Sequence, residues 1–200
     1  MRTHAVVDSP CGPLTLVAEG AALCGLYMVD QRHRPDELTF GLHDPGAAVF
    51  DRAETELKEY FAGQRHEFEV PLAFAGTPFQ QLVWAELCKI PYGATISYGQ
   101  LADRLGKPAA SRAVGLANGK NPISIIVPCH RVVGSTGSLT GYGGGLERKR
   151  YLLDFEQGPS SDPTSWEPGP PWCEIGGTRG GAGRRGGVRD GRIADREDLR

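Results

Sequence analysis

The sequence of 200 residues predicts a mixed α/β (α+β) fold in two parts, a small antiparallel sheet with one helix followed by a mostly helical domain. Short β-branched runs separated by Gly and Pro turns fill the first part, whereas the second part shows helical periodicity with capping signals. A hydrophobic content of 40% is enough for a core. We therefore expect domains at 1–76 and 77–157, and a disordered tail at 158–200, where Gly, Pro and Arg dominate.

Three short runs predict the sheet of the first part, at residues 5–7, 14–18 and 23–29. Gly and Pro turns separate them, which is typical of an antiparallel meander. The polar, proline-containing residues 32–45 predict a loop. In residues 47–61 the apolar side chains recur at helical spacing, so one amphipathic helix is expected to close the sheet.

Capping signals predict the helices of the second part. A capping box at residues 77–80 starts one helix, and Ser97 caps another over 98–105. A further helix over 109–118 follows a tight turn, which gives a helix-turn-helix signature that αα-corners without DNA function share. Glycine-rich residues 134–145 predict a wing. The second part is therefore predicted to be a winged helix-turn-helix domain.

The second helix of this pair has one face that is nearly bare. The side chains expected to face inward are Ala110, Ala113, Val114 and Ala117. Those expected to face outward are Ala109, Ser111, Arg112 and Gly115. A face of small residues could approach a groove closely and insert its single cation. Residues 77–157 carry 9 Lys/Arg against 5 Asp/Glu, which favours a polyanionic substrate, although a solvated basic face has the same composition.

Cys129 is the candidate reactive residue, and it lies in a predicted Pro-Cys-His-Arg turn. Two β-branched runs, 125–127 and 132–133, bracket the turn and predict strands, and the proline breaks the pairing between them. The adjacent His130 and Arg131 form an electropositive setting that is expected to lower the pKa of the thiol and make it nucleophilic. A buried structural cysteine is the alternative interpretation.

A third side chain is expected to orient the imidazole. Neighbours in a strand point to opposite faces, so His130 reaches Cys129 only through a turn or a bridging water. Glu156 lies on the packing face of a final helix over 146–156, because it follows Leu152 by one helical turn. An exposed, frayed helix end is the alternative. An inward Glu156 completes a relay of nucleophile, base and orienting acid.

Cysteine usage and hydropathy indicate the cellular setting. Five scattered cysteines without a CxxC pair favour neither a disulfide framework nor a zinc knuckle, and no metal or cofactor is expected. No apolar run of about 18 residues occurs, and the N-terminus lacks an apolar signal core, so no membrane partner is expected. We expect a cytoplasmic protein with reduced thiols.

Pro128-Cys129-His130-Arg131 is preceded by Asn121-Pro122 and followed by Gly141-Tyr142-Gly143-Gly144-Gly145-Leu146. This set resembles the O6-alkylguanine-DNA alkyltransferases, also called methylated-DNA–protein-cysteine methyltransferases, and the similarity runs from about residue 77 to residue 156. The resemblance implies a ribonuclease H-like N-terminal domain and a self-consumed repair protein. Such a protein flips O6-alkylguanine, and by extension O4-alkylthymine, out of double-stranded DNA from the minor groove and takes the alkyl group irreversibly onto its own cysteine.

The resemblance also implies a role for each residue of the reacting group. Cys129 is the alkyl acceptor, and His130 is its water-linked base. Glu156 holds that base, Asn121 orders the turn, and Tyr142 donates a proton toward the leaving guanine.

The remaining implied roles concern DNA and the flipped base. Arg112 fills the vacated base stack and Tyr98 helps to rotate the target nucleotide. The carbonyl of Val127 and the backbone around Gly143 hydrogen-bond the base, with Lys149 nearby. The other implied DNA-binding residues are Ala110, Ser111 and Gly115. The protein is expected to act as a monomer and to be associated with the nucleoid.

Departures from the family pattern and other function classes leave several points open. Ser124 stands where some relatives have proline and Gly143 where some have serine, so the size of the accepted alkyl group is undecided. The N-terminal cysteines and histidines do not match the zinc pattern of some relatives. The alternatives are a noncatalytic winged-helix DNA-binding regulator or lesion sensor, and a cysteine hydrolase. The number of methyl groups transferred per protein separates the classes: one, none or many.

Overall fold

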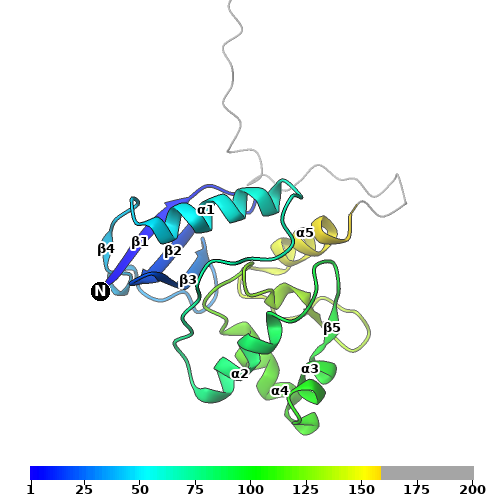
Figure 1. The fold of residues 1–200 in the computed structure, drawn as a ribbon. Helices are drawn as coiled ribbons and strands as arrows, with labels where there is room; N and C mark the ends of the chain where they lie inside the picture. Colours follow the sequence, from blue (N-terminus) through cyan, green and yellow to red (C-terminus); the bar gives the residue numbers. More distant parts are fainter. Residues whose placement is uncertain (159–200) are drawn as a thin grey trace, which may run out of the picture.

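The computed structural model describes residues 1–158 and has a mixed α/β architecture (Figure 1). A sheet with one long helix forms the N-terminal part, and mainly short helices form the C-terminal part. This is the fold class that the sequence predicts, which is confirmed. The predicted tail lies outside the described residues from residue 159 onward.

The N-terminal sheet has the strand order β3-β2-β1-β4. Strands β1 (Arg2–Val7), β2 (Leu14–Glu19) and β3 (Ala22–Met28) form the antiparallel meander that the turn signals predict. Strand β4 (Leu42–His43) pairs parallel to β1, within residues 32–45, for which the sequence predicts only a loop. Two extended residues are too few to produce a periodic signal, so sequence patterns miss such a strand.

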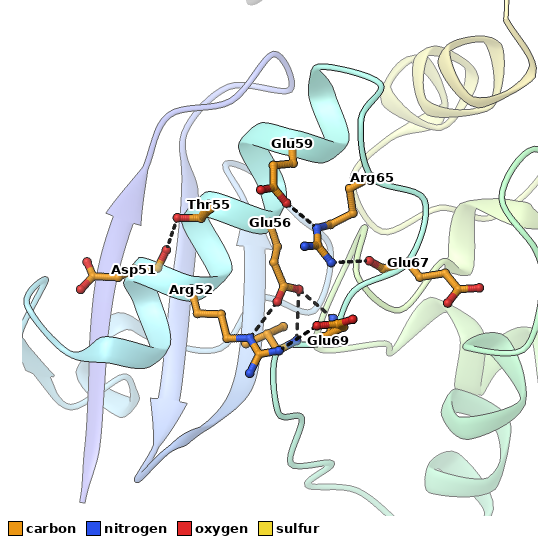
Figure 2. A network of polar contacts seen from close by, with 9 residues as sticks. Asp51, Arg52, Thr55, Glu56, Glu59, Arg65, Glu67 and Glu69 are labelled. Carbon is orange, nitrogen blue, oxygen red and sulfur yellow. Dashed lines mark hydrogen bonds and ion pairs between the residues drawn. The ribbon is translucent and has the colours of Figure 1, made fainter.

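Helix α1 (Ala48–Phe61) covers the sheet and is tied to the segment that follows it (Figure 2). Glu56 of α1 accepts a hydrogen bond from Arg52 Nε at 2.8 Å. Its other oxygen accepts from the backbone N–H groups of Glu69 and Val70, at 2.8 and 3.1 Å. The apolar face of α1 consists of buried Val49, Phe50, Ala53, Leu57 and Tyr60.

The C-terminal part follows the capping signals closely. It consists of α2 (Pro78–Leu87), β5 (Ile96–Ser97), α3 (Tyr98–Arg104), α4 (Ser111–Gly119), β6 (Val132–Val133) and α5 (Leu146–Gln157). Helices α2 and α3 begin with complete capping boxes. A 3₁₀ turn at Pro108–Ala110 precedes α4, so this helix begins later than the sequence predicts. The short strands β5 and β6 pair in parallel next to α3.

Residues 125–127 are not the strand that their β-branched character predicts. Ile125 has a φ of 70°, in the left-handed region that β-branched residues rarely adopt. The backbone N–H groups of the next two residues donate to the carbonyls of Ser124 and Ile123, at 2.8 and 3.0 Å. Pairing is limited to an isolated bridge between Ile123 and Leu26 of β3. The run is apolar because its side chains are buried, and burial produces the same composition as a strand.

One hydrophobic core joins the two parts, since buried side chains of the sheet, of α1 and of the Cys129 turn form a single cluster. Arg148 of α5 adds a polar connection by donating to the carbonyls of Cys11 and Val29 in the N-terminal part. Within residues 1–158 no helix has the length and apolar character that a bilayer crossing needs. In the same residues, His, Cys, Asp and Glu side chains form no group of three that could hold a metal ion.

Candidate active site

Cys129 begins the 3₁₀ helix Cys129–Arg131, so the turn that the sequence predicts is present. Its side chain is only 3% exposed. Asn121 holds the approach to this turn, because its Oδ1 accepts from the Ile123 N–H at 3.0 Å and its Nδ2 donates to the Val127 carbonyl at 2.8 Å. The N–H of Cys129 donates to the same carbonyl at 2.8 Å. The backbone that carries the thiol is therefore fixed by short hydrogen bonds.

Burial raises the pKa of the Cys129 thiol to about 11. The Asn121 amide and the Lys149 ammonium oppose the rise, but burial outweighs them. The prediction that the adjacent His130 and Arg131 give the thiol a lowered pKa is therefore wrong. Arg131, the nearest cation in sequence, directs its guanidinium to Glu156 and to a backbone carbonyl. A thiol in this setting needs a proton acceptor before it can act as a nucleophile.

Glu156 of α5 is buried and faces inward, as its position in the helix predicts. Its Oε1 lies 2.8 Å from His130 Nε2, and Arg131 donates to both carboxylate oxygens at 2.8 Å. Tyr60 Oη donates to Oε1 at 2.7 Å, and the Gly93 N–H donates to Oε2 at 3.2 Å. Burial opposes ionisation, but hydrogen bonds from His130 and Arg131 outweigh it and lower the pKa of the Glu156 carboxyl. Glu156 is therefore a carboxylate at neutral pH.

His130 is a neutral imidazole whose tautomer is set by Glu156. Burial lowers the pKa of His130, and the charge on Glu156 opposes this effect without cancelling it. Because ionised Glu156 can only accept, Nε2 is the ring nitrogen that carries the hydrogen. Nδ1 is then an acceptor, and it is buried without a hydrogen-bond partner among residues 1–158. The ring therefore makes no direct hydrogen bond to Cys129, and its Nδ1 is available to take up a proton.

Lys149 and Tyr98 lie near enough to Cys129 that the charge of an ionised thiol affects the pKa of both side chains. Lys149 is fully buried and donates to the carbonyls of Val132 and Thr140, each at 2.6 Å. Burial lowers the pKa of Lys149 to about 8, with the negative charge of an ionised Cys129 opposing. Tyr98 Oη donates to the Thr140 carbonyl at 3.1 Å, and its ring centre lies 6.0 Å from Lys149 Nζ. Both side chains anchor the glycine-rich segment before α5 next to the reactive turn.

Tyr142 has a buried hydroxyl that lacks a hydrogen-bond partner among residues 1–158. Burial raises the pKa of Tyr142 well above its usual range, and Cys129 adds to the rise, while Ser124 lies close enough to oppose it. Ser124 itself donates to Gln31 of the N-terminal part at 3.2 Å. The phenol therefore keeps its hydrogen and can donate a hydrogen bond to a group that enters the space beside the thiol.

The backbone groups expected to hold a flipped base are already engaged. The Val127 carbonyl accepts from both Asn121 and Cys129, at 2.8 Å each. A carbonyl has two lone pairs, so a base can contact Val127 only if one of these bonds is given up. The Gly143 carbonyl accepts from the Arg32 N–H at 2.8 Å. This bond places the glycine-rich segment against the N-terminal part.

The outer face of α4 differs in part from the predicted one. Arg112 is exposed, as predicted, but Ala113, which was expected to face inward, is exposed as well. Val114 faces the core, and the neighbouring position on a helix points about 100° away from it. Leu116, one turn after Arg112, is 70% exposed and was not predicted as part of this face. The residues that are partly exposed are Ala110, Ser111 and Gly115.

Sequence reasoning missed three contacts of the site. The sequence indicates only an electropositive effect for Arg131, whereas its guanidinium donates to Glu156 through two nitrogens. Asn118 is buried and donates to the Cys129 carbonyl at 3.3 Å. Tyr60 lies 96 positions before its partner Glu156. The helical spacing of apolar side chains in residues 47–61 places Tyr60 on the packing face, but no local signal shows which carboxylate its hydroxyl contacts.

Comparison with known proteins agrees with this geometry. The family profile described as "6-O-methylguanine DNA methyltransferase, DNA binding domain" matches residues 78–158. The profile described as "6-O-methylguanine DNA methyltransferase, ribonuclease-like domain" matches residues 3–74. The chain belongs to the 6-O-methylguanine DNA methyltransferase family. The resemblance that the sequence motifs indicate is thereby confirmed.

Similar members of this family include proteins named methylated-DNA–protein-cysteine methyltransferase. The one from Mycobacterium tuberculosis is 55% identical over 157 residues, covering 78% of this chain and 93% of the relative. The one from Mycobacterium leprae is 53% identical over 151 residues, covering 76% and 90%. The crystal structure of Mycobacterium tuberculosis OGT in complex with DNA matches with a TM-score of 0.73 and 54% identity, covering 78% and 93%. The chain is accordingly an enzyme of DNA repair by alkyl transfer.

Proposed function

We propose that this family member repairs double-stranded DNA by moving the alkyl group of O6-alkylguanine, and of O4-alkylthymine, to Sγ of Cys129. The observation that carries this assignment is a buried thiol on a fixed turn, followed by a neutral imidazole whose tautomer is set by Glu156. The similarity to an OGT structure in complex with DNA supports DNA as the partner.

The transfer is a displacement at the alkyl carbon. The Sγ–C bond forms while the C–O6 bond breaks, and the thiol proton passes through a water to Nδ1 of His130. Tyr142 gives a proton to the departing guanine and regains one from the His130 imidazolium, so that in net terms the thiol proton replaces the alkyl group on the base. The product is a thioether on Cys129, and its alkyl group is not released again because an alkyl thiolate is a poor leaving group. One protein therefore accepts one alkyl group and is consumed.

Access to the lesion uses the outer face of α4. Small residues there allow a close approach to the minor groove, and Arg112 enters the gap that the flipped base leaves. Leu116 extends the same face by one helical turn and offers an apolar contact to the groove wall. Flipping costs a few kcal/mol and less for a poorly paired alkylated base, which favours damaged sites. The protein acts as a monomer on its site.

Cys129→Ala is expected to abolish methyl transfer and to leave binding to an alkylated duplex largely intact, because the thiol contributes little to phosphate contacts. Transfer is followed by peptide mass spectrometry after incubation with a duplex that contains O6-methylguanine. Cys88→Ala is the matched control, since Cys88 is exposed and lies outside the site.

Counting methyl groups tests the proposal at the same time. One methyl group per protein, located on Cys129, is the expected result. Methyl groups on another residue, or many turnovers per protein, would contradict it and favour a different acceptor or a hydrolase.

Arg112→Ala is expected to slow repair of duplex DNA by roughly 10- to 100-fold, which corresponds to a flipping cost of a few kcal/mol. The reaction with free O6-benzylguanine should be almost unchanged, because a free base leaves no gap to fill. Arg104→Ala on α3 removes an equal charge from an exposed position and serves as the control. Equal losses of Arg112→Ala on both substrates would show that Arg112 does not act in flipping.

A further inference from the structure

The N-terminal part reaches the catalytic turn through one buried hydroxyl. Helix α1 ends beside α5, although the two helices belong to different parts of the fold (Figure 1). Tyr60, near the end of α1, is fully buried, and its Oη donates to Glu156 Oε1 at 2.7 Å. His130 Nε2 is bonded to this same oxygen at 2.8 Å. The phenol and the imidazole therefore share one carboxylate oxygen.

From this shared oxygen we infer that Tyr60 is a positioning residue for alkyl transfer, acting on His130 through Glu156. The inference rests on the relay proposed above and adds a member from the N-terminal domain. The hydroxyl helps to keep Glu156 ionised and withdraws negative charge from Oε1. The carboxylate still accepts the hydrogen bond from His130 Nε2–H, but it stabilises the doubly protonated imidazolium less strongly. Nδ1 thereby stays open to the proton of Cys129.

The hydroxyl and the ring of Tyr60 make different contacts, so they can be tested separately. The ring packs edge-on against Phe61 at 5.0 Å, Phe155 at 5.5 Å and Tyr92 at 6.0 Å between ring centres. These packing contacts do not need the hydroxyl, so Tyr60→Phe retains them and removes only the donor. Burial, followed by the charge on Glu156, raises the pKa of Tyr60 well above its usual range. The phenol is therefore a donor at every pH used for repair.

The sign of the effect follows from the charges around the imidazole. Without the Tyr60 hydroxyl, Oε1 keeps more of its negative charge and stabilises the imidazolium more strongly, which raises the pKa of His130. A protonated His130 cannot accept the thiol proton, so repair is lost on the acid side of the pH profile. The titratable and charged groups that face this pair are Arg131, Lys149, Cys129 and Tyr92.

The test is the pH dependence of the single-turnover rate with free O6-benzylguanine, which avoids DNA binding. Tyr60→Phe is expected to shift the acid limb of the profile to higher pH by up to about one unit, so the rate on that limb falls by up to about 10-fold while the rate at pH 9 is nearly unchanged. Tyr92→Phe is the matched control, because Tyr92 packs in the same cluster and its hydroxyl has no hydrogen bond to Glu156. Its profile should match that of the unsubstituted protein.

A double substitution separates this inference from the proposed relay. In a Glu156→Gln background, Tyr60→Phe is expected to have no further effect on the acid limb, since both act through one carboxylate. If Glu156→Gln alone leaves the rate unchanged, the relay itself is wrong. If Glu156→Gln slows the reaction but Tyr60→Phe gives the unsubstituted profile, or a uniform loss at all pH values, only the role of Tyr60 is wrong.

A measurement on the unsubstituted protein keeps the inference open to disproof even if Tyr60→Phe unfolds. The ¹⁵N chemical shifts of the His130 ring report which nitrogen carries the hydrogen. A hydrogen on Nε2 from pH 6 to 9 is the expected result. A hydrogen on Nδ1 in the neutral ring would overturn the inference, because Glu156 would then not be held as the acceptor that Tyr60 helps to maintain.

Discussion

Two buried glutamates of this protein have similar partners and different consequences. Glu56 of α1 and Glu156 of α5 each bind an arginine, and hydrogen bonds lower the pKa of each carboxyl despite burial. The remaining donors to Glu56 are the backbone N–H groups of Glu69 and Val70, which do not titrate (Figure 2). Among the donors to Glu156 is His130, whose second ring nitrogen can take up a proton during the reaction.

The difference between the two clusters shows what turns a buried carboxylate into part of a reaction. Glu56 fixes the segment after α1 and stabilises the fold, since all its donors keep their protons. Glu156 also fixes a segment, but one of its partners is the imidazole of His130, the residue after Cys129. The other ring nitrogen of His130, Nδ1, is an acceptor without a partner among residues 1–158. A pair of arginine and glutamate is therefore not diagnostic by itself. The titratable third partner and the nearby thiol decide the role.

Among changes to the two glutamates and their partners, the largest effect is expected for His130→Gln. Glutamine can still donate to Glu156, but it cannot take up the thiol proton, so the alkylation rate at neutral pH should fall by about 100-fold or more. His66→Gln is a suitable control, since His66 is exposed and stacks on Tyr92 without reaching Glu156. The measurement is the single-turnover rate with O6-benzylguanine. A loss of less than about threefold would remove His130 from the relay and make the two glutamates equivalent.

The smallest effect on the rate is expected for Glu56→Gln, which should change it by less than about twofold because Glu56 contacts no group of the relay. The same change should lower the free energy of unfolding by about 1–3 kcal/mol, the range for hydrogen bonds to a charged group. Because the pKa of Glu56 is lowered on folding, this stabilisation is present above the unfolded pKa and is lost as pH falls through the folded one. Chemical denaturation at pH 7 measures the loss of stability, and the same measurement at pH 3 shows whether the difference disappears. A large loss of rate in a folded variant would mean that the Glu56 cluster is coupled to the site.

Much of the site was predictable because its signals are local. The Pro-Cys-His-Arg turn and the position of Glu156 one helical turn after Leu152 predict the thiol, the imidazole and the inward carboxylate. Capping boxes likewise predict where α2 and α3 begin. Each of these features depends on residues within a few positions of one another.

The remaining features depend on burial and on long-range contacts. The pKa of Cys129 is raised rather than lowered because the turn is enclosed by both parts of the fold, which neighbouring residues in sequence do not show. Residues 125–127 have the composition of a strand because they are buried, and the partner that would pair with them is absent from their surroundings in the described chain. Tyr60 meets Glu156 only after α1 and α5 have packed.

The most direct test of the difference between the two glutamates is the pH–rate profile of Glu156→Gln with free O6-benzylguanine. A neutral amide no longer stabilises the imidazolium of His130, so the apparent pKa of Cys129 should rise and the rate near pH 7 should fall by roughly 10- to 100-fold. At high pH most of this loss should be recovered, because hydroxide ionises the thiol without the relay. A profile identical to that of the unsubstituted protein would contradict the account, since Glu156 would then be a structural carboxylate like Glu56.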